Sequence, residues 1–244
     1  MGEPVLLVGK LKAGYGGPPI IEDVDLRAHA GRITVIVGLN GAGKSTLLRA
    51  IAGTLQISGG EVKLNGADLT GRPPEDLLRA GISYVPQVEN VFPSLSVREN
   101  LEMGGYIIPR SQVRNKISEV CELFPDLKGA LRRPARTLSG GQRHMLAVAR
   151  GLMVKPAVLL LDEPTAGLAP RVEVSVWDSI RAIAATGVAM VVVDQNVRRA
   201  LSHADWGYVM SLGRNLTDGP GHELLHSDDV GGLYSAVAKE SRGP

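Results

Sequence analysis

A glycine-rich loop between an apolar run and a helical run constrains this chain more than any other feature. Residues 38–45 read Gly-Leu-Asn-Gly-Ala-Gly-Lys-Ser, which matches G-x-x-x-x-G-K-[ST] at every fixed position. Residues 33–37 before the loop are typical of a buried strand, and residues 44–52 after it are typical of a helix. Such a unit turns its backbone amides inward, where they join the helix N-terminus as an anion site. The sequence therefore predicts a phosphate-binding loop.

The loop assigns a role to each of its polar side chains. Lys44 is expected to reach the β- and γ-phosphates of a nucleotide, and the Ser45 hydroxyl is expected to ligate Mg²⁺. A glycine-rich turn with a chance lysine is the alternative, and the strand and helix on either side argue against it. The predicted nucleotide contacts of this segment are Gly38, Asn40, Gly41, Ala42, Gly43, Lys44, Ser45 and Thr46.

Short apolar runs alternate with helical patterns, as expected of an α/β protein with a mostly parallel sheet and helices on its faces. Strands covered on both faces need near-continuous apolar runs. These occur at residues 33–37, 82–85, 157–161 and 188–193. More polar, turn-rich strands are expected at residues 5–11, 20–26 and 61–64. We predict that the polar strands form an N-terminal antiparallel flap beside the parallel sheet.

Strand signals vanish between Pro93 and Val154, and helical patterns replace them. The expected helices in this part are residues 96–104, 111–124 and 140–154, and another helix follows at 172–185. We therefore predict one domain over residues 1–244, with a core of 1–87 and 155–244 and an inserted helical lobe of 88–154. The chain after Tyr234 is expected to end a helix and continue loosely.

Composition excludes several classes of protein. Hydrophobic residues make up 44% and charged residues 21%, as in a folded chain rather than a disordered one. A net charge of +2 is too small to indicate a nucleic-acid partner. No apolar run approaches the roughly 20 residues that span a bilayer, and no signal peptide is evident. The single cysteine, Cys121, suits a reducing compartment. We expect a cytoplasmic chain that reaches a membrane only through partners.

Two carboxylates follow one of the buried runs. Residues 158–161 are apolar, and Asp162 and Glu163 come directly after them. An acid at the carboxyl end of a parallel strand lies at the edge where such folds bind ligands. Asp162 is expected to hold Mg²⁺ through water, and Glu163 to polarise the attacking water. A strand ending in solvated acids would look the same, but beside a phosphate loop the pair indicates nucleotide hydrolysis.

A second glycine pair lies at residues 138–142, which read Leu-Ser-Gly-Gly-Gln. Ser139 is expected to cap the helix that follows, and the glycines leave backbone amides exposed at its N-terminus. This arrangement would make a second anion site. An ordinary capped helix would have the same pattern, and from capping alone that interpretation is favoured.

The order of these motifs resembles that of the ATP-binding-cassette ATPases. The chain has LSGGQ between the phosphate loop and the run LLLDEP at residues 159–164, and the similarity extends from Val5 to about Tyr234. The resemblance implies a P-loop NTPase fold that uses ATP and Mg²⁺. In this family LSGGQ of one subunit closes over the ATP held by another. The residues so placed on the nucleotide in trans are Ser139, Gly140 and Gly141, together with Gln142.

The resemblance assigns three further residues. Tyr15 matches the aromatic residue that stacks on adenine. Gln87, after the triplet at 84–86, matches the glutamine that joins core to lobe and senses Mg²⁺ and the attacking water. Gln195 lies where most members have a histidine, and Ala169 where many have an aspartate. Both departures are similar to the ATPases of branched-chain amino-acid importers. The Gln195 amide can still donate to a developing phosphate charge, unless it only ends the strand in solvent.

The resemblance also implies partners. These are a second copy or homologous ATPase subunit, membrane-spanning permease subunits and, indirectly, a solute-binding protein, with the chain held peripherally on the inner face of the membrane. An exporter or lipid-transport ATPase is one alternative, and a soluble cassette acting on nucleic acid or ribosomes is another. A single phosphate loop without sustained heptads argues against the latter. The arginines at 132, 133, 136 and 143 are interpreted as a solvated face.

Overall fold

The computed structural model describes residues 2–88 and 90–227, which form two sheets with helices around them. An antiparallel sheet has the order β2-β1-β4-β5, and a larger sheet has the order β10-β9-β3-β8-β7-β6, parallel except for β10. The predicted α/β class, with its parallel sheet and antiparallel flap, is confirmed. The strands are β1 Leu6–Ala13, β2 Ile21–Ala28, β3 Ile33–Val37, β4 Ile57–Leu64, β5 Ala67–Asp68, β6 Ile82–Val85, β7 Val158–Asp162, β8 Ala189–Val193, β9 Trp206–Ser211 and β10 Arg214–Pro220.

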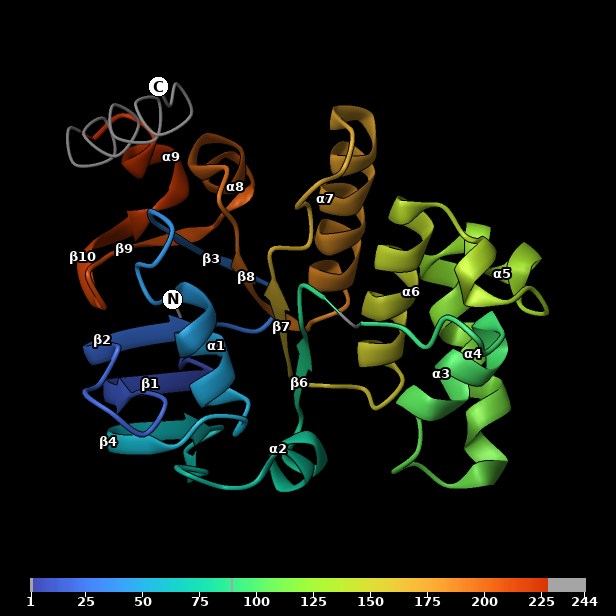
Figure 1. The fold of residues 1–244 in the computed structure, drawn as a ribbon, viewed down its shortest axis with the longest axis horizontal. Coiled ribbons are helices and arrows are strands. Elements are labelled where there is room, and N and C mark those ends of the chain that lie inside the picture. The colour runs from blue at the N-terminus through green and yellow to red at the C-terminus, as the bar shows by residue number, and fades with distance from the viewer. Residues whose placement is uncertain (1, 89, 228–244) are drawn as a thin grey trace.

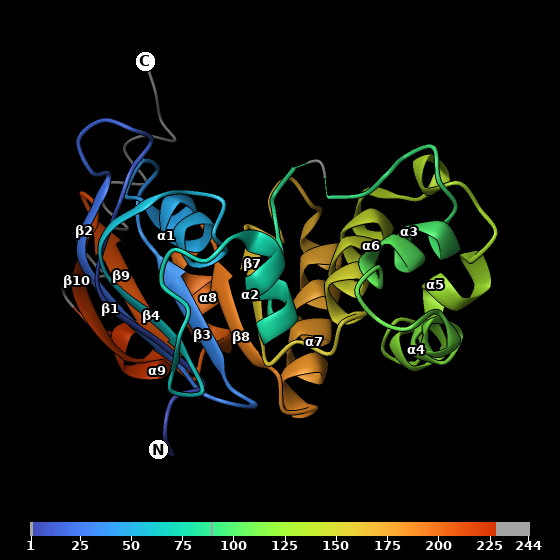
Figure 2. The same ribbon diagram turned by 90° about the horizontal axis from the view of Figure 1, so that it is seen from below.

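The helices divide into those that cover the sheets and those that gather in a lobe. Figures 1 and 2 show α3 to α6 together at one end, the strands at the other, and α7 between them. The lobe interrupts the chain between β6 and β7, as predicted. The helices are α1 Lys44–Ile51, α2 Pro74–Ala80, α3 Val97–Gly104, α4 Arg110–Leu123, α5 Pro125–Ala130, α6 Gly140–Leu152, α7 Pro170–Ala185, α8 Val197–His203 and α9 Gly221–Leu224.

The parallel strands serve two cores, because neighbouring residues of a strand point to opposite faces. Ile36, Leu160 and Val191 pack with α1 and the antiparallel sheet. Val35 and Leu159, each one residue earlier, pack with α6 and α7 on the other face. Strands that are apolar on both faces are the pattern on which the prediction of a parallel sheet rested.

Helix α1 lies between the two sheets and belongs to the first of these cores. Leu48 and Ile51 have no exposed surface and share their core with Leu6 of β1 and Leu160 of β7. A buried leucine or isoleucine contributes about 1.5–3 kcal/mol relative to an exposed one. The packing of α1 therefore holds its N-terminus, and the loop before it, against the carboxyl ends of the strands.

The predicted elements agree well with those observed, and the rest of the chain adds several more. Strands at 33–37 and 82–85 have the predicted bounds, and the helix expected at 111–124 is shifted by one residue. Helices α2, α5, α8 and α9 and strands β9 and β10 were not predicted. The segment after Tyr234 lies outside the described residues, and the division at 87/88 and 154/155 stays a prediction. Within residues 2–88 and 90–227, none of the helices combines the length and apolarity of a membrane span.

Asn100 of α3 fixes the connection that leads from the sheet into the lobe. Its side chain is completely buried. Its carbonyl oxygen accepts from the backbone amide of Phe92 at 2.8 Å, and its amide donates to the backbone oxygens of Phe92 and Ser96 at 3.0 Å each. One buried side chain therefore satisfies backbone groups of a segment with little regular structure.

Replacing Asn100 with alanine is expected to lower the free energy of unfolding by about 2–3 kcal/mol, because several hydrogen bonds of a buried side chain to the backbone of Phe92 and Ser96 are lost. Urea denaturation followed by circular dichroism measures the change. The control is Asn115→Ala, at an exposed position of α4, which should change stability by less than about 0.5 kcal/mol. Equal effects of the two substitutions would contradict this role of Asn100.

Candidate functional site

The loop between β3 and α1 has a backbone that only glycine permits at two positions. Gly43 has a φ of +95°, and a Cβ there would lie 2.6 Å from Cγ2 of Ile21. At Gly38, with a φ of +155°, a Cβ would lie 2.2 Å from the backbone oxygen of Met210. The loop therefore packs closely against residues of β2 and β9. Asn40 and Gly41 are exposed, whereas Ala42 and Thr46 are buried.

Lys44 closes this loop with its own side chain. Its ammonium is buried and donates to the backbone oxygens of Gly38 at 2.9 Å and Leu39 at 3.0 Å. Burial lowers the pKa of Lys44, and the charges of Glu163, Asp162 and Asp194 oppose that effect. The ammonium thus lies inside the loop among carboxylates, where a phosphate could replace the carbonyl oxygens as its partner.

Ser45 and Asp162 meet across the gap between α1 and β7. The Ser45 hydroxyl donates to Oδ1 of Asp162 at 2.8 Å. A hydroxyl and a carboxylate are hard oxygen ligands, and Mg²⁺ is usually held by one or two carboxylates plus waters and phosphates. The residues that the structure describes contain no cluster of three or more acidic, histidine or cysteine side chains suited to a metal. The pair fits a magnesium ion that arrives with a nucleotide.

Glu163 brings together two glutamines from different loops. It is buried, and its φ of +49° is unusual for a residue with a Cβ. Gln87 Nε2, from the loop after β6, donates to Oε2 of Glu163 at 2.8 Å, and Gln195 Nε2, from the loop after β8, donates to the same atom at 2.5 Å. Gln195 is exposed as a residue, yet its amide lies against this carboxylate. Its role toward a phosphate stays a prediction.

Asp194 is a buried carboxylate of the site that the sequence did not reveal. Its Oδ2 accepts from the Thr165 hydroxyl at 2.6 Å, and its Oδ1 accepts from the Asn196 backbone amide at 2.8 Å. Burial raises the pKa of Asp194 despite these hydrogen bonds. The Thr165 contact ties the loop after β7 to the loop after β8. Asp194 immediately precedes Gln195, and this end-of-strand position was the only available signal.

Tyr15, in the turn between β1 and β2, stands over α1. Its ring is 57% exposed, and its hydroxyl accepts from Nη1 of Arg49 at 3.0 Å. Arg49 lies one helical turn after Ser45 on α1. The aromatic ring predicted to stack on a base is therefore available at the surface, and its hydroxyl contacts the helix that follows the phosphate loop.

The LSGGQ segment is explained within this chain by local structure. Ser139 and Gln142 form a reciprocal capping box at the start of α6, with backbone–side-chain distances of 3.2 and 3.1 Å. A Cβ on Gly141 would lie 2.4 Å from Cγ1 of Val172 in α7, whereas one on Gly140 would meet no atom closer than 3.7 Å. Figures 1 and 2 show α6 well apart from α1. The chain does not bring LSGGQ to its own phosphate loop.

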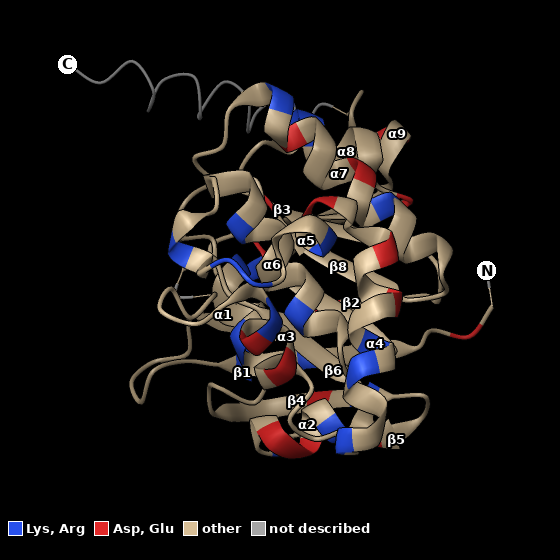
Figure 3. Ribbon diagram, turned by 90° about the vertical axis from the view of Figure 1, so that its right-hand side faces the viewer, with Lys and Arg blue, Asp and Glu red and all other residues tan. Residues whose placement is uncertain are grey.

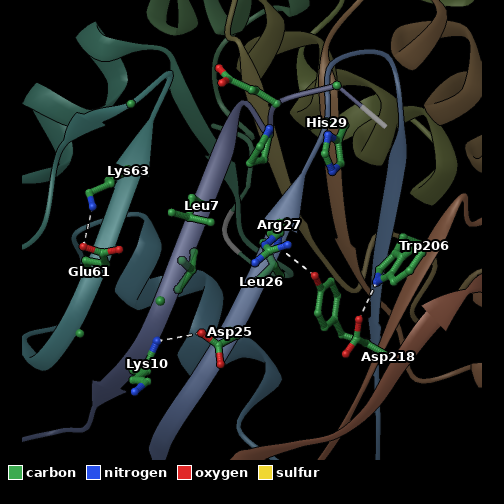
Figure 4. A pocket seen from close by; sticks show the side chains of 18 residues that line it. Leu7, Lys10, Asp25, Leu26, Arg27, His29, Glu61, Lys63, Trp206 and Asp218 are labelled. Carbon is green, nitrogen blue, oxygen red and sulfur yellow. Dashed lines mark hydrogen bonds and ion pairs between the residues drawn. The ribbon is translucent and has the colours of Figure 1, made fainter.

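A wide hollow of about 1250 Å³ lies away from these residues, on the outer side of β1, β2 and β4 beside β9 (Figure 4). Its polar groups largely satisfy one another. Asp25 accepts from the Lys10 backbone amide at 3.1 Å, and Trp206 Nε1 donates to Asp218 at 3.0 Å. None of the residues predicted to contact nucleotide lines this hollow. The carboxyl ends of β3 and β7 therefore remain the candidate site.

Comparisons with known proteins agree with this location. The ABC transporter family matches residues 21–166, which include the phosphate loop, Gln87, LSGGQ and Asp162. The chain is 41% identical to the probable branched-chain amino acid transport ATP-binding protein LivF of Archaeoglobus fulgidus, over 90% of this chain and 93% of that protein. It is 38% identical to the high-affinity branched-chain amino acid transport ATP-binding protein BraG of Pseudomonas aeruginosa, over 94% of this chain and 99% of that protein.

A solved structure is similar over the same length. The crystal structure of an ATP-binding cassette of an ABC transporter in its ADP conformation aligns with a TM-score of 0.86 and 26% identity, covering 96% of this chain and 99% of that one. The family match, the two relatives and this fold all cover the phosphate loop and the acidic end of β7. The chain belongs to the ABC transporter family, in which it is an ATP-binding subunit.

Proposed function

We propose that this chain is the Mg²⁺-dependent ATPase of an importer of branched-chain amino acids. The observation that carries the proposal is the meeting of Lys44 and Ser45 with Asp162 and Glu163 at the carboxyl ends of β3 and β7. Phosphoryl transfer requires a cation, a hydroxyl and carboxylates beside a glycine-rich phosphate loop, and these groups are present here. The names of the two relatives at 38% and 41% identity favour branched-chain amino acids as the solute.

Each side chain has a distinct task in the proposed hydrolysis. Lys44 exchanges its carbonyl partners for phosphate oxygens. Ser45 supplies an oxygen ligand beside the phosphates, and Asp162 supplies another through a bridging water. Mg²⁺, when bound, neutralises charge that develops on the phosphate oxygens. Glu163 accepts a proton from the water that attacks the γ-phosphate. The amides of Gln87 and Gln195 hold the Glu163 carboxylate in one orientation, which supports this assignment.

We also propose that two ATPase subunits, identical or homologous, complete each other's sites. The N-terminus of α6 is remote from α1 within the chain (Figure 2), so its exposed Ser139 and open Gly140 have no nucleotide of their own to contact. Helix N-termini bind anions through free amides and the helix dipole. A γ-phosphate held by one subunit and contacted by α6 of the other would satisfy both half-sites.

A groove beside the lobe supports a membrane-spanning partner. It encloses about 240 Å³, and its wall includes Tyr84, Met103, Tyr106 and Arg150. Met103 and Tyr106 are 48% and 59% exposed, which is high for large apolar side chains. We infer that a short apolar helix of a permease subunit occupies this groove and holds the chain at the inner face of the membrane, with a solute-binding protein acting through the permease.

A nucleic-acid-associated cassette is less well supported. Nucleic-acid sites need a surface of one sign. The helices of the lobe side carry lysine and arginine interspersed with aspartate and glutamate (Figure 3), and the net charge of the chain is only +2. The similar LivF and BraG proteins are named as transport proteins. Transport is therefore the function that we propose.

Replacing Lys44 with alanine should lower ATP turnover by about a hundredfold or more, since a charged donor to the phosphates is lost. Phosphate release by the purified chain with ATP and Mg²⁺ measures this. Lys63→Ala is the control, because the Lys63 ammonium pairs with Glu61 on the flap at 2.7 Å. Turnover by Lys44→Ala equal to that of the control would sink the ATPase assignment.

Glu163→Gln should keep the shape of the site while removing its base, so ATP stays bound and holds two chains together. Size-exclusion chromatography with light scattering should then report a dimer with ATP and Mg²⁺ and a monomer without them. The homodimer is contradicted if the variant binds ATP but remains monomeric at every protein concentration tested. A heterodimer with a homologous subunit would then be the form to test.

Tyr106→Glu should weaken assembly with the permease subunits, because a charge would enter an apolar contact. Co-purification with permease subunits encoded by neighbouring genes measures the effect. Leu216→Glu is a matched control at 53% exposure on β10, far from the groove. The basal ATPase activity of both variants should match that of the wild type. Equal recovery of the permease with both variants would exclude this groove as the docking surface.

A further inference from the structure

The pairing of β6 with β7 places Tyr84 diagonally opposite Asp162. Tyr84 is paired with Leu160, and Asp162 lies two residues further along β7. Side chains two residues apart in a strand point to the same face. Tyr84, Leu160 and Asp162 therefore emerge together on the face that packs against α1. The sequence pattern did not indicate this proximity, because the two polar residues are 78 positions apart.

Each oxygen of the Asp162 carboxylate has its own hydrogen-bond donor. The Tyr84 hydroxyl donates to Oδ2 at 3.1 Å, and the Ser45 hydroxyl donates to Oδ1 at 2.8 Å. The two donors come from two separate elements, β6 and α1. A carboxylate held at both oxygens by two separate elements has a single orientation.

The surroundings of Tyr84 keep its hydroxyl protonated. Burial and the neighbouring Asp162 charge raise the pKa of Tyr84 to about 12, against an opposing effect of Arg49. At neutral pH the hydroxyl is therefore a donor. Arg49 lies one turn beyond Ser45 on α1, and the nearby Tyr84 and Tyr15 hydroxyls raise the pKa of its guanidinium. Arg49 thus links Tyr84 to the exposed Tyr15.

We propose that Tyr84 is a positioning residue whose hydroxyl orients the Asp162 carboxylate toward the magnesium ion that accompanies ATP. This inference rests on the proposed function. Oδ1 of Asp162 faces Ser45, the other oxygen ligand of the pair, so the Tyr84 hydrogen bond at Oδ2 selects which oxygen is presented. Partners of metal ligands commonly orient those ligands, and their loss weakens metal binding by about 10- to 100-fold. Tyr84 has this relation to Asp162.

The test is the Mg²⁺ dependence of nucleotide binding by Tyr84→Phe, which keeps the ring and removes only the hydroxyl. A fluorescent ATP analogue is titrated into metal-free protein, and Mg²⁺ is then added at fixed nucleotide. The Mg²⁺ concentration at half-maximal tightening should rise about tenfold. The affinity for the analogue without Mg²⁺ should stay at the wild-type value, because Asp162 does not contact the nucleotide directly.

Tyr208→Phe is the matched control. Tyr208 is buried, whereas Tyr84 is partly buried, and the Tyr208 hydroxyl accepts from the Arg27 backbone amide at 3.0 Å, away from Asp162. It should leave the Mg²⁺ dependence unchanged. The proposal is overturned if Tyr84→Phe has the wild-type midpoint, or if it loses affinity equally with and without Mg²⁺, as a purely structural residue would. A wild-type chain that binds no nucleotide would instead refute the proposed function itself.

Discussion

The packing of α1 between the two sheets is the constraint on which the site depends. Leu48 and Ile51 anchor the helix in a core that both sheets share. This anchoring sets the helix N-terminus, and hence Ser45, at hydrogen-bond distance from Asp162 of β7. The glycine loop lies so close to β2 and β9 that a Cβ on Gly43 or Gly38 would clash with Ile21 or Met210, and the Ala42 oxygen accepts from the Gly213 amide at 3.1 Å. The anion site is therefore built by hydrophobic burial, and its polar groups occupy positions that the cores define.

Much of the fold could be predicted because its signals are local. The phosphate loop is a contiguous pattern, and the strands at 33–37 and 82–85 are continuous apolar runs with the observed bounds. Strand β10 was missed because most of its residues are polar and it includes glycine and proline, which are rare in strands. Helices α5 and α9 are too short to show a helical period.

The site was predicted less completely than the fold, because several of its contacts join distant parts of the chain. The position of Asp162 at the carboxyl end of a predicted parallel strand indicated that it would lie at the ligand-binding edge, near the loop. It did not indicate that Tyr84 would reach Asp162, or that Thr165 would bind Asp194, since both depend on register. LSGGQ shows the converse limit. Its serine, second glycine and glutamine are explained by capping and by packing on Val172. Only the open surface at Gly140 is left over for the contact in trans that we propose.

Glu163 has a strained backbone, and its carboxylate is contacted by side chains from two separate loops. Its left-handed backbone costs of order 1–3 kcal/mol, and the surrounding structure holds it through a hydrogen bond from its amide to the Val193 oxygen at 2.9 Å. Gln87 and Gln195, which lie in two different loops, both donate a hydrogen bond to its Oε2. One leads into the helical lobe and the other follows β8, so movement of either loop alters the same carboxylate. In the proposed function, the proton acceptor therefore responds to the lobe that contacts the permease. The hydrogen bond to Val193 opposes relaxation of this strained backbone, so the Glu163 carboxylate stays within reach of both glutamines.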